Sequence, residues 1–89
     1  MNYKLVKTEI KAGHRSLVAV GDAAAGDLNI HDGSGWVPAT LKDIEAGSSV
    51  LVIEKSYFIK TSPIKAVHKK DSDTLILETG TSTYKLTEV

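Results

Sequence analysis

The last third of the chain, residues 57–89, constrains the fold more than any other segment. It consists of short runs rich in β-branched and aromatic residues, each bounded by Pro, Gly, Ser or Asp. Runs of this kind are typical of antiparallel strands joined by tight turns. The pattern therefore predicts an unbroken β-meander, with strands over 57–61, 64–68, 74–79 and 82–86 separated by Ser62-Pro63, Asp71-Ser72-Asp73 and Gly80-Thr81.

The length and composition indicate one globular domain and exclude several kinds of chemistry. A chain of 89 residues supports a single domain, so we assign residues 1–89 to one β domain. Because 11 Lys and Arg balance 11 Asp and Glu, no net charge draws the protein to nucleic acid or to an anionic membrane. The absence of cysteine excludes disulfides and thiolate chemistry. Lysines interrupt the apolar residues of segment 1–7, so we expect neither a signal peptide nor a membrane span, and a cytoplasmic location.

The N-terminal half shows a less regular pattern. Three alanines between Gly21 and Asp27 favour helix, but the flanking Gly and Asp leave too few residues for a stable one. We therefore expect an irregular connection at 21–27. The other expected elements are strands over 4–10 and 16–20, the second mostly buried, a loop over 12–15, and short strands over 28–31 and 36–37 around a turn at Asp32-Gly33-Ser34-Gly35.

One helical turn is expected in the middle of the chain. Thr40 can cap it with Asp43 at the third position, and Gly47 stands where a glycine would end it, so we place the turn over 41–46. The run that follows, 49–53, contains four consecutive large aliphatic residues, which predicts a central strand buried on both faces.

These elements predict an all-β fold. About six to eight short strands close their hydrophobic faces best as a small antiparallel barrel or a two-layer sandwich, of SH3-like or OB-like size. The side chains expected in the core are Leu51, Ile53, Leu75, Leu77 and Leu86.

The sequence contains no catalytic or metal-binding constellation. The three histidines, at positions 14, 31 and 68, lack the spacing that aims two imidazoles at one metal. Gly80-Thr81-Ser82-Thr83 begins like a nucleophile elbow but lacks its closing glycine, and no His and acid are placed to activate Ser82. We therefore expect no metal, no cofactor and no enzymatic activity.

The only tryptophan, Trp36, is the first candidate for binding. It follows Gly33-Ser34-Gly35, which leaves its loop adaptable. A single Trp in a small domain can lie on the core as a lid. That is the commoner arrangement, and the alternative is a stacking platform for a base or an anchor at a protein interface.

Positive charge within residues 60–70 is the second candidate, because four lysines and a histidine gather there. Strand alternation puts Lys65 and Lys69 on one face and His68 on the other. Such lysines can form a solvated face that protects a strand edge. They can also form an anion site with hydroxyls and free turn amides nearby. The candidate ligand-binding residues are Trp36, Lys60, Thr61, Ser62, Lys65, Thr81, Ser82 and Tyr84.

Two short segments carry a resemblance. A Thr-Ser-Pro-Ile strand start at 61–64 precedes a Thr-x-x-Ser-x-Tyr-x-Leu closing strand at 79–86. This pattern resembles one found in small β-domain proteins encoded by bacteriophages and mobile elements, which are mostly uncharacterised. The resemblance covers the C-terminal third and implies a small β-domain of phage origin, with no active-site residues. The residues themselves explain the pattern, because Pro63 fixes φ at the strand start while Tyr84 and Leu86 share the inward face.

We therefore expect a non-enzymatic binding protein. The leading hypothesis is a phage-derived inhibitor of a host (defence) process that binds a protein partner or sequesters a phosphate-bearing small ligand. The first alternative is a nucleic-acid-binding module of SH3-like or OB-like shape, with Trp36, Tyr57 and Tyr84 as stacking residues. The second is a structural or assembly component of a phage particle. We expect a homo-oligomer that forms through the edge of the final strand, and no membrane association.

Overall fold

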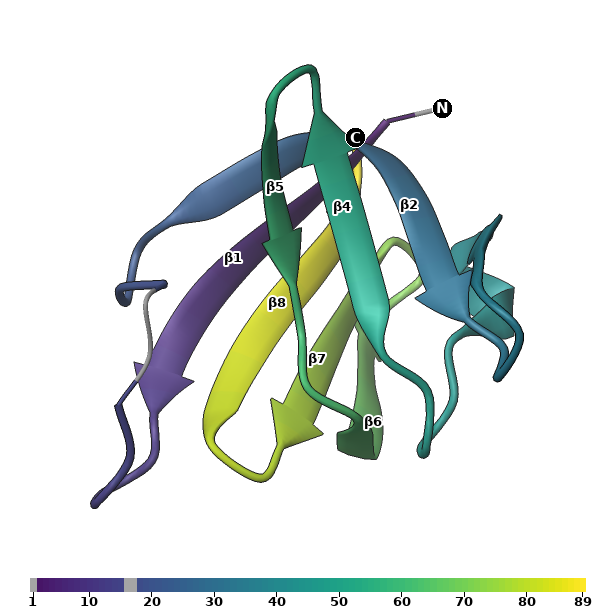
Figure 1. The fold of residues 1–89 in the computed structure, drawn as a ribbon. Coiled ribbons are helices and arrows are strands. Elements are labelled where there is room, and N and C mark those ends of the chain that lie inside the picture. Colours follow the sequence, from purple (N-terminus) through teal and green to yellow (C-terminus); the bar gives the residue numbers. More distant parts are fainter. Residues whose placement is uncertain (1, 16–17) are drawn as a thin grey trace.

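The computed structural model describes residues 2–15 and 18–89 and shows an all-β domain (Figure 1). Eight antiparallel strands form one open sheet in the order β5-β4-β2-β1-β8-β7-β6, with β3 paired to β2. The predicted fold class is therefore confirmed. The strands are β1 (Tyr3–Ile10), β2 (Ala23–His31), β3 (Trp36–Pro38), β4 (Val50–Glu54), β5 (Tyr57–Lys60), β6 (Ile64–Asp71), β7 (Thr74–Thr79) and β8 (Ser82–Glu88).

Strand β2 belongs to both halves of the sheet. Its first residues, 23–26, pair with β1, and its residues 27–30 pair with β4. The change of partner falls at Gly26, where a Cβ atom would lie 2.8 Å from the carbonyl carbon of Ile53 and closer still to its oxygen. Only glycine lets the two backbones approach this closely, so Gly26 determines where the sheet bends.

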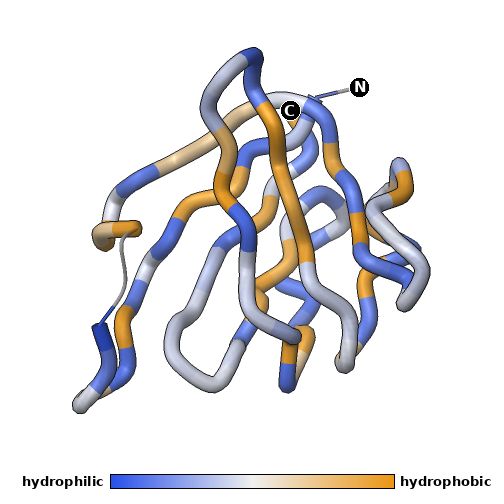
Figure 2. The backbone as a smooth tube through the Cα atoms, viewed as in Figure 1, coloured by the Kyte–Doolittle hydropathy of each residue, from blue (hydrophilic) through white to orange (hydrophobic). Residues whose placement is uncertain are grey.

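The core lies between the two halves of the bent sheet. Along β1 and β8 alternate residues are buried, which is the expected periodicity of half-buried strands, and Figure 2 shows hydrophobic and hydrophilic positions interspersed along the backbone. As predicted, Tyr84 and Leu86 share the inward face, at 4% and 0% exposure. The buried cluster comprises Tyr3, Leu5, Ala24, Leu28, Ile44, Val50, Val52, Ile59, Ile64, Leu75, Leu77, Tyr84 and Leu86.

The prediction of an unbroken meander over 57–89 is wrong at its first step. Strands β6, β7 and β8 do form a meander, but β5 pairs with β4 and lies at the opposite edge of the sheet from β6. The physical reason is the tight turn at Lys55-Ser56, where Lys55 has a positive φ of 49° and brings β5 back along the aliphatic strand β4. Strand β5 then ends before Pro63, which has no N–H to donate to a ladder.

The prediction for residues 18–27 is also wrong. Residues 16–17 of the expected strand over 16–20 lie outside the described residues, and the segment 18–20 is not a strand. Asp22 instead closes a turn there, because its Oδ2 accepts the N–H of Ala19 at 2.9 Å. The expected irregular connection at 21–27 contains the start of β2, since small alanine side chains fit where β2 crosses between the halves, with Ala24 only 1% exposed.

The helical turn is shorter than predicted. Among the described residues there is one helix, a 3-10 turn over Leu41–Asp43, whose Asp43 carboxylate accepts the Thr40 N–H at 2.8 Å and the Thr40 hydroxyl at 3.1 Å. The two residues expected to cap the helix, Thr40 and Asp43, are therefore hydrogen-bonded to each other. The helix ends early because Ile44 turns extended and is buried in the core. Gly47, expected to end the helix, instead donates its N–H to the carbonyl of Ile64 at 2.8 Å.

Strand β4 is central, as predicted, because it lies between β2 and β5. Val50, Leu51 and Val52 are all buried, so burial on both faces is confirmed for this part of the strand. Ile53 was expected in the core but is 38% exposed, because it lies on the outer face where the strand ends.

The final strand cannot form an oligomer through its edge. Strand β8 pairs with β1 on one side and with β7 on the other, so both of its edges are occupied (Figure 1). Among the described strands, unpaired edges belong to β5, to the short strand β3, which pairs only with β2, and to β6 beyond Ile64, whose backbone bonds to Gly47 and Ser48.

Candidate ligand-binding site

The pairing register of β2, β3, β4 and β5 defines an outer face, opposite the core. Cross-strand partners share one face of a sheet, and successive residues along a strand alternate between faces. In one row, Trp36 stands opposite His31, whose N–H bonds to the carbonyl of Ser49 at 3.1 Å. In the next row, Leu51 stands opposite Lys60. The side chains of both rows therefore point away from the core.

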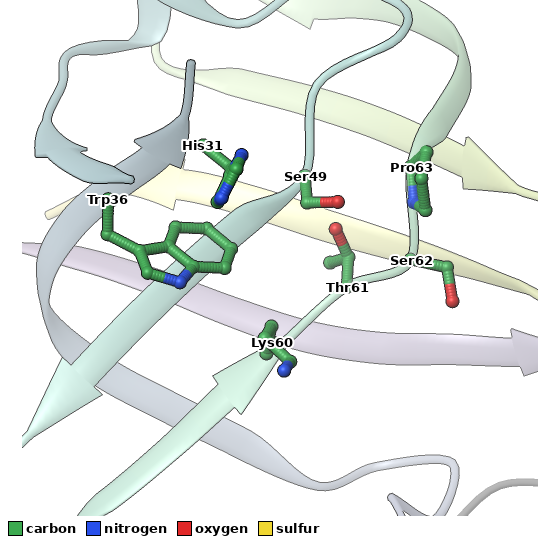
Figure 3. Close-up of a pocket in the computed structure, with 7 residues that line it drawn as sticks. All are labelled: His31, Trp36, Ser49, Lys60, Thr61, Ser62 and Pro63. Carbon is green, nitrogen blue, oxygen red and sulfur yellow. The ribbon is translucent and has the colours of Figure 1, made fainter. Parts of the chain in front are cut away.

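A pocket of about 420 Å³ lies along these two rows (Figure 3). Its volume is within the range of pockets that bind small molecules. Three separate segments build it: the β2–β3 hairpin, the residue that precedes β4, and the end of β5 with its connection to β6. The lining residues are His31, Trp36, Ser49, Lys60, Thr61, Ser62 and Pro63.

Trp36 is on the outer face, so its position as a lid on the core is excluded. Its side chain is 37% exposed, and its ring meets that of His31 edge-on, with centroids 5.2 Å apart and an interplanar angle of 84°. An edge-to-face contact of this kind is a favourable aromatic arrangement. His31 therefore fixes the indole against the sheet while part of the indole stays accessible.

The turn that carries Trp36 is held by Asp32. Its Oδ1 accepts the N–H of Ser34 at 2.9 Å, the hydroxyl of Ser34 at 2.7 Å and the N–H of Gly35 at 3.2 Å. These hydrogen bonds, that of the Ser34 hydroxyl first, lower the pKa of Asp32. The N–H of Gly33 donates to Nδ1 of His31 at 3.1 Å, which leaves Nε2 as the protonated nitrogen of the neutral ring.

Thr61 positions the opposite wall of the pocket. Its side chain is buried, and its Oγ1 accepts the N–H of Val50 at 3.0 Å while its own N–H donates to the Val50 carbonyl at 2.8 Å. This pair of bonds ties the end of β5 to the start of β4 and thereby sets the positions of Lys60 and Ser62. The Thr61 hydroxyl is therefore mainly structural, whereas Ser62 lies exposed at the rim with its hydroxyl turned away from the indole (Figure 3).

Lys60 supplies the positive charge of the pocket. It is exposed, and within residues 2–15 and 18–89 no carboxylate lies at ion-pair distance from it. Around it stand the hydroxyl of Ser49, the imidazole of His31 and the indole of Trp36. The pocket thus combines a flat aromatic surface, a cation and hydrogen-bond donors, which suits a ligand with a ring and an anionic group.

The structure does not bring the other sequence candidates to this pocket. Lys65 lies beside Gly80 at the β7–β8 turn. The amides of that turn, expected to be free for an anion, are already bonded, because Thr79 Oγ1 accepts the N–H groups of Thr81 at 3.3 Å and of Ser82 at 3.0 Å. Two of the backbone amides expected to bind an anion at the β7–β8 turn are therefore not free.

Ser82 and Tyr84 lie in the core, at 0% and 4% exposure. Burial raises the pKa of the Tyr84 hydroxyl, and its ring faces Nζ of Lys7 at 5.5 Å from the centroid. Lys7 itself is 1% exposed and donates to the carbonyl of Val18 at 3.0 Å, and burial lowers its pKa. Sequence reasoning missed this buried lysine, although the alternation of Tyr3, Leu5 and Lys7 indicated an inward position.

The remaining charges of the lysine cluster line strand β6. Lys65, Lys69 and Lys70 are exposed, and Nε2 of His68 forms a hydrogen bond with Oε2 of Glu78 at 2.7 Å. Sequence reasoning also missed His31, Ser49 and Pro63 as pocket residues. They join the pocket through the pairing of β2 with β4 and through the path of the chain after β5, and no local motif carries that information.

Other kinds of site find little support in the part of the chain that the structure describes. No three His, Cys, Asp or Glu side chains there are grouped to hold a metal ion. No helix in that part has the length and apolar character needed to cross a membrane. Comparison of the chain with known proteins finds no matching family model, no matching curated protein and no matching solved structure.

Proposed function

We propose that the protein is a non-enzymatic binding protein whose outer-face pocket takes a small ligand with a flat ring and a phosphate group. The observation that carries the proposal is the convergence of Trp36 and Lys60 on one pocket, with no carboxylate beside Lys60 among the described residues. An exposed indole offers a face for a ring, and an uncompensated ammonium offers a charge for a phosphate.

The arrangement of donors supports the same class of ligand. With the ring against Trp36 and a phosphate near Lys60, we expect the Ser49 hydroxyl and the imidazole of His31 to supply further hydrogen bonds, because both residues line the same pocket. A volume of about 420 Å³ accommodates a mononucleotide-sized molecule. Binding alone would let such a protein act as an inhibitor of a host process, the role we expect for it, because sequestering a phosphate-bearing ligand needs no catalytic group.

The alternative of nucleic-acid binding has less support. Tyr84, one of its three expected stacking residues, is buried, and the equal numbers of basic and acidic residues provide no general attraction to a phosphate backbone. Trp36 and Lys60 remain compatible with stacking on a single-stranded base. A salt titration separates the two cases, since binding along a backbone weakens steeply as salt rises.

The proposal is tested by titrating the protein with AMP and with inorganic phosphate while following the fluorescence of its only tryptophan. We expect AMP to quench Trp36 and to bind more tightly than phosphate. Lys60→Gln should weaken AMP binding about 10-fold or more, since a hydrogen bond to a charged group contributes about 1.5–3 kcal/mol. Trp36→Ala, followed by calorimetry, should weaken it as well.

Lys69→Gln is the matched control, because Lys69 is an exposed lysine outside the pocket. It should leave AMP binding unchanged. Equal affinities of the Lys60→Gln and Lys69→Gln proteins for AMP, or no binding of either probe by the unaltered protein, would refute the proposed site.

A further inference from the structure

Strands β5 and β6, the two end strands of the main sheet path, differ in how their outer edges are protected. Strand β6 carries irregularities in its pairing at Lys65 and at Lys70, and its lysines are exposed. Bulges and lysines are the usual means by which an edge strand avoids pairing with another chain. The β6 edge is therefore blocked.

Strand β5 has none of this protection. Its pairing with β4 is regular over all four residues, and Lys60 is its only charged residue. Tyr57 and Phe58 are large, apolar and 46% and 54% exposed. A regular, apolar and exposed edge is a template for another strand.

The alternation of hydrogen-bonded pairs along the β4–β5 ladder shows which N–H and C=O groups of β5 point toward β4 and which point outward. Thr61 and Val50 form a hydrogen-bonded pair of the β4–β5 ladder, since the Thr61 N–H donates to the Val50 carbonyl. Hydrogen-bonded pairs alternate in an antiparallel ladder, so Ile59 and Tyr57 also bond to β4. The N–H and C=O groups of Phe58 and Lys60 therefore point outward, away from β4.

We propose that β5 pairs antiparallel with β5 of a second copy of this chain, about a two-fold axis at Ile59. A two-fold axis perpendicular to the sheet keeps the outer faces of both copies on one side. Residues directly opposite each other share a face, so each outer-face residue, Phe58 or Lys60, must lie opposite an outer-face residue of the partner. With Ile59 on the axis, Phe58 faces the partner's Lys60 and Lys60 faces the partner's Phe58. All four outward N–H groups of the two strands then find a carbonyl.

The side chains in this register are also complementary. On the outer face, each Lys60 ammonium lies beside a Phe58 ring of the other copy, a favourable cation–aromatic contact. The neighbouring register, with Phe58 on the axis, places Lys60 opposite Ser56, which belongs to the β4–β5 turn. That register separates Lys60 from the aromatic ring, so the arrangement centred on Ile59 is favoured.

The dimer also completes the candidate pocket. Lys60 lines the pocket in each copy, and the partner's Phe58 would add an aromatic wall beside it. This consequence for the ligand rests on the proposed function, whereas the dimer itself does not. Oligomeric state is therefore measured without ligand, so that failure of the dimer and failure of the ligand site give different results.

The test uses the absence of cysteine from the chain. In the proposed register Ser56 lies opposite the partner's Ser62, and the Cα atoms of a hydrogen-bonded pair, about 5.5 Å apart, are within disulfide range. The double variant S56C/S62C should form a covalent dimer on mild oxidation. The single variants S56C and S62C are the controls and should not form one, because in this register neither position lies opposite the same position of the partner. Within one chain the two positions are about 20 Å apart along the strand, too far to bridge.

Native mass spectrometry of the unaltered chain gives the second measurement. We expect a dimer, and a shift to monomer in Phe58→Lys, because two lysines would then face each other across the edge. Val20→Lys, at a residue of similar exposure outside β5, should stay dimeric. A monomer at every concentration, a dimer that Phe58→Lys leaves intact, or equal cross-linking of the single and double cysteine variants would overturn the proposal.

Discussion

Replacing Gly26 with alanine should destabilise the protein more than any other addition of a single methyl group to its glycines. The added Cβ would overlap the carbonyl oxygen of Ile53 and lie 2.8 Å from its carbonyl carbon and 3.3 Å from Cα of Glu54. Carbon atoms pack at about 3.5–4.0 Å, and all three of these neighbours are backbone, which cannot rotate away as a side chain can. Strand β2 must therefore move away from β4 at the point where it passes from one half of the sheet to the other.

The size of the effect follows from what this movement breaks. Forcing a methyl group into a packed site costs about 1–3 kcal/mol. A shift at Gly26 also strains the adjacent pairing of Asp27 with Ile53, and each lost hydrogen bond adds about 0.5–1.5 kcal/mol. We expect a loss of about 3 kcal/mol in the free energy of unfolding, or a melting temperature lower by roughly 12–24 °C for a domain of this size.

The measurement is urea unfolding followed by circular dichroism and by Trp36 fluorescence. Gly80→Ala is the matched control, because a Cβ there meets only the flexible end of Lys65, at 3.5 Å from Cε and 3.7 Å from Nζ. That variant should unfold within about 0.5 kcal/mol of the original protein. A Gly26→Ala protein that is equally stable would refute the close approach of β2 to β4.

Three further predictions concern polar groups. Burial lowers the pKa of Lys7 below its ordinary 10.5, so the folded protein holds fewer protons than the unfolded chain between these values and stability rises with pH there. The stability curve of the Lys7→Met protein should lack this rise. The stability difference between the original protein and the variant should therefore increase with pH in this range, since the tyrosines that titrate nearby are common to both proteins. Asp32 has a lowered pKa, so its contribution is present above pH 3.8 and is lost as pH falls through the lowered value. Asp32→Ala should speed amide exchange in the Trp36 turn at neutral pH and match the original protein in strong acid. Thr61→Val leaves the buried N–H of Val50 without its acceptor and should cost about 1–3 kcal/mol in urea unfolding, whereas Thr61→Ser should cost less.

Local sequence patterns were sufficient to predict most strands and their turns. Asp32-Gly33-Ser34-Gly35 closes a hairpin, and the aliphatic run of β4 is central. These features depend on residues close together in the chain, such as a glycine with positive φ or an unbroken apolar stretch. Strand order depends instead on which edges meet after the chain folds back, which is why β5 was wrongly placed beside β6.

The start of β2 shows a different limit. Alanine has low intrinsic preference for strands, so the segment at 23–25 resembled a connection. In the folded protein its small side chains are what allow β2 to cross between the two halves of the sheet, with Ala24 fully enclosed. The tertiary packing overrides the local preference here, and a single sequence carries no sign of it.

The candidate site could be predicted only in part. Trp36 and the group Lys60, Thr61 and Ser62 were singled out as two separate candidates, and the structure shows them lining one pocket, with the Thr61 hydroxyl bonded to β4. His31 joined them only through the register of β2 with β3. A site assembled from three separate segments is determined by register, and register cannot be deduced from the segments one at a time.

The pairing of β1 with β8 also determines when this protein can fold during its synthesis. Strand β1 leaves the ribosome early, yet one of its partners, residues 82–88, is made more than seventy residues later. Until then the long edge of β1 that β8 will occupy stays open, and the core side chains Leu5 and Tyr3 are only partly covered. Folding is therefore completed after translation of β8 and is limited by a search over a long stretch of chain. In a crowded cell, the interval before that closure is when the nascent chain depends most on chaperones.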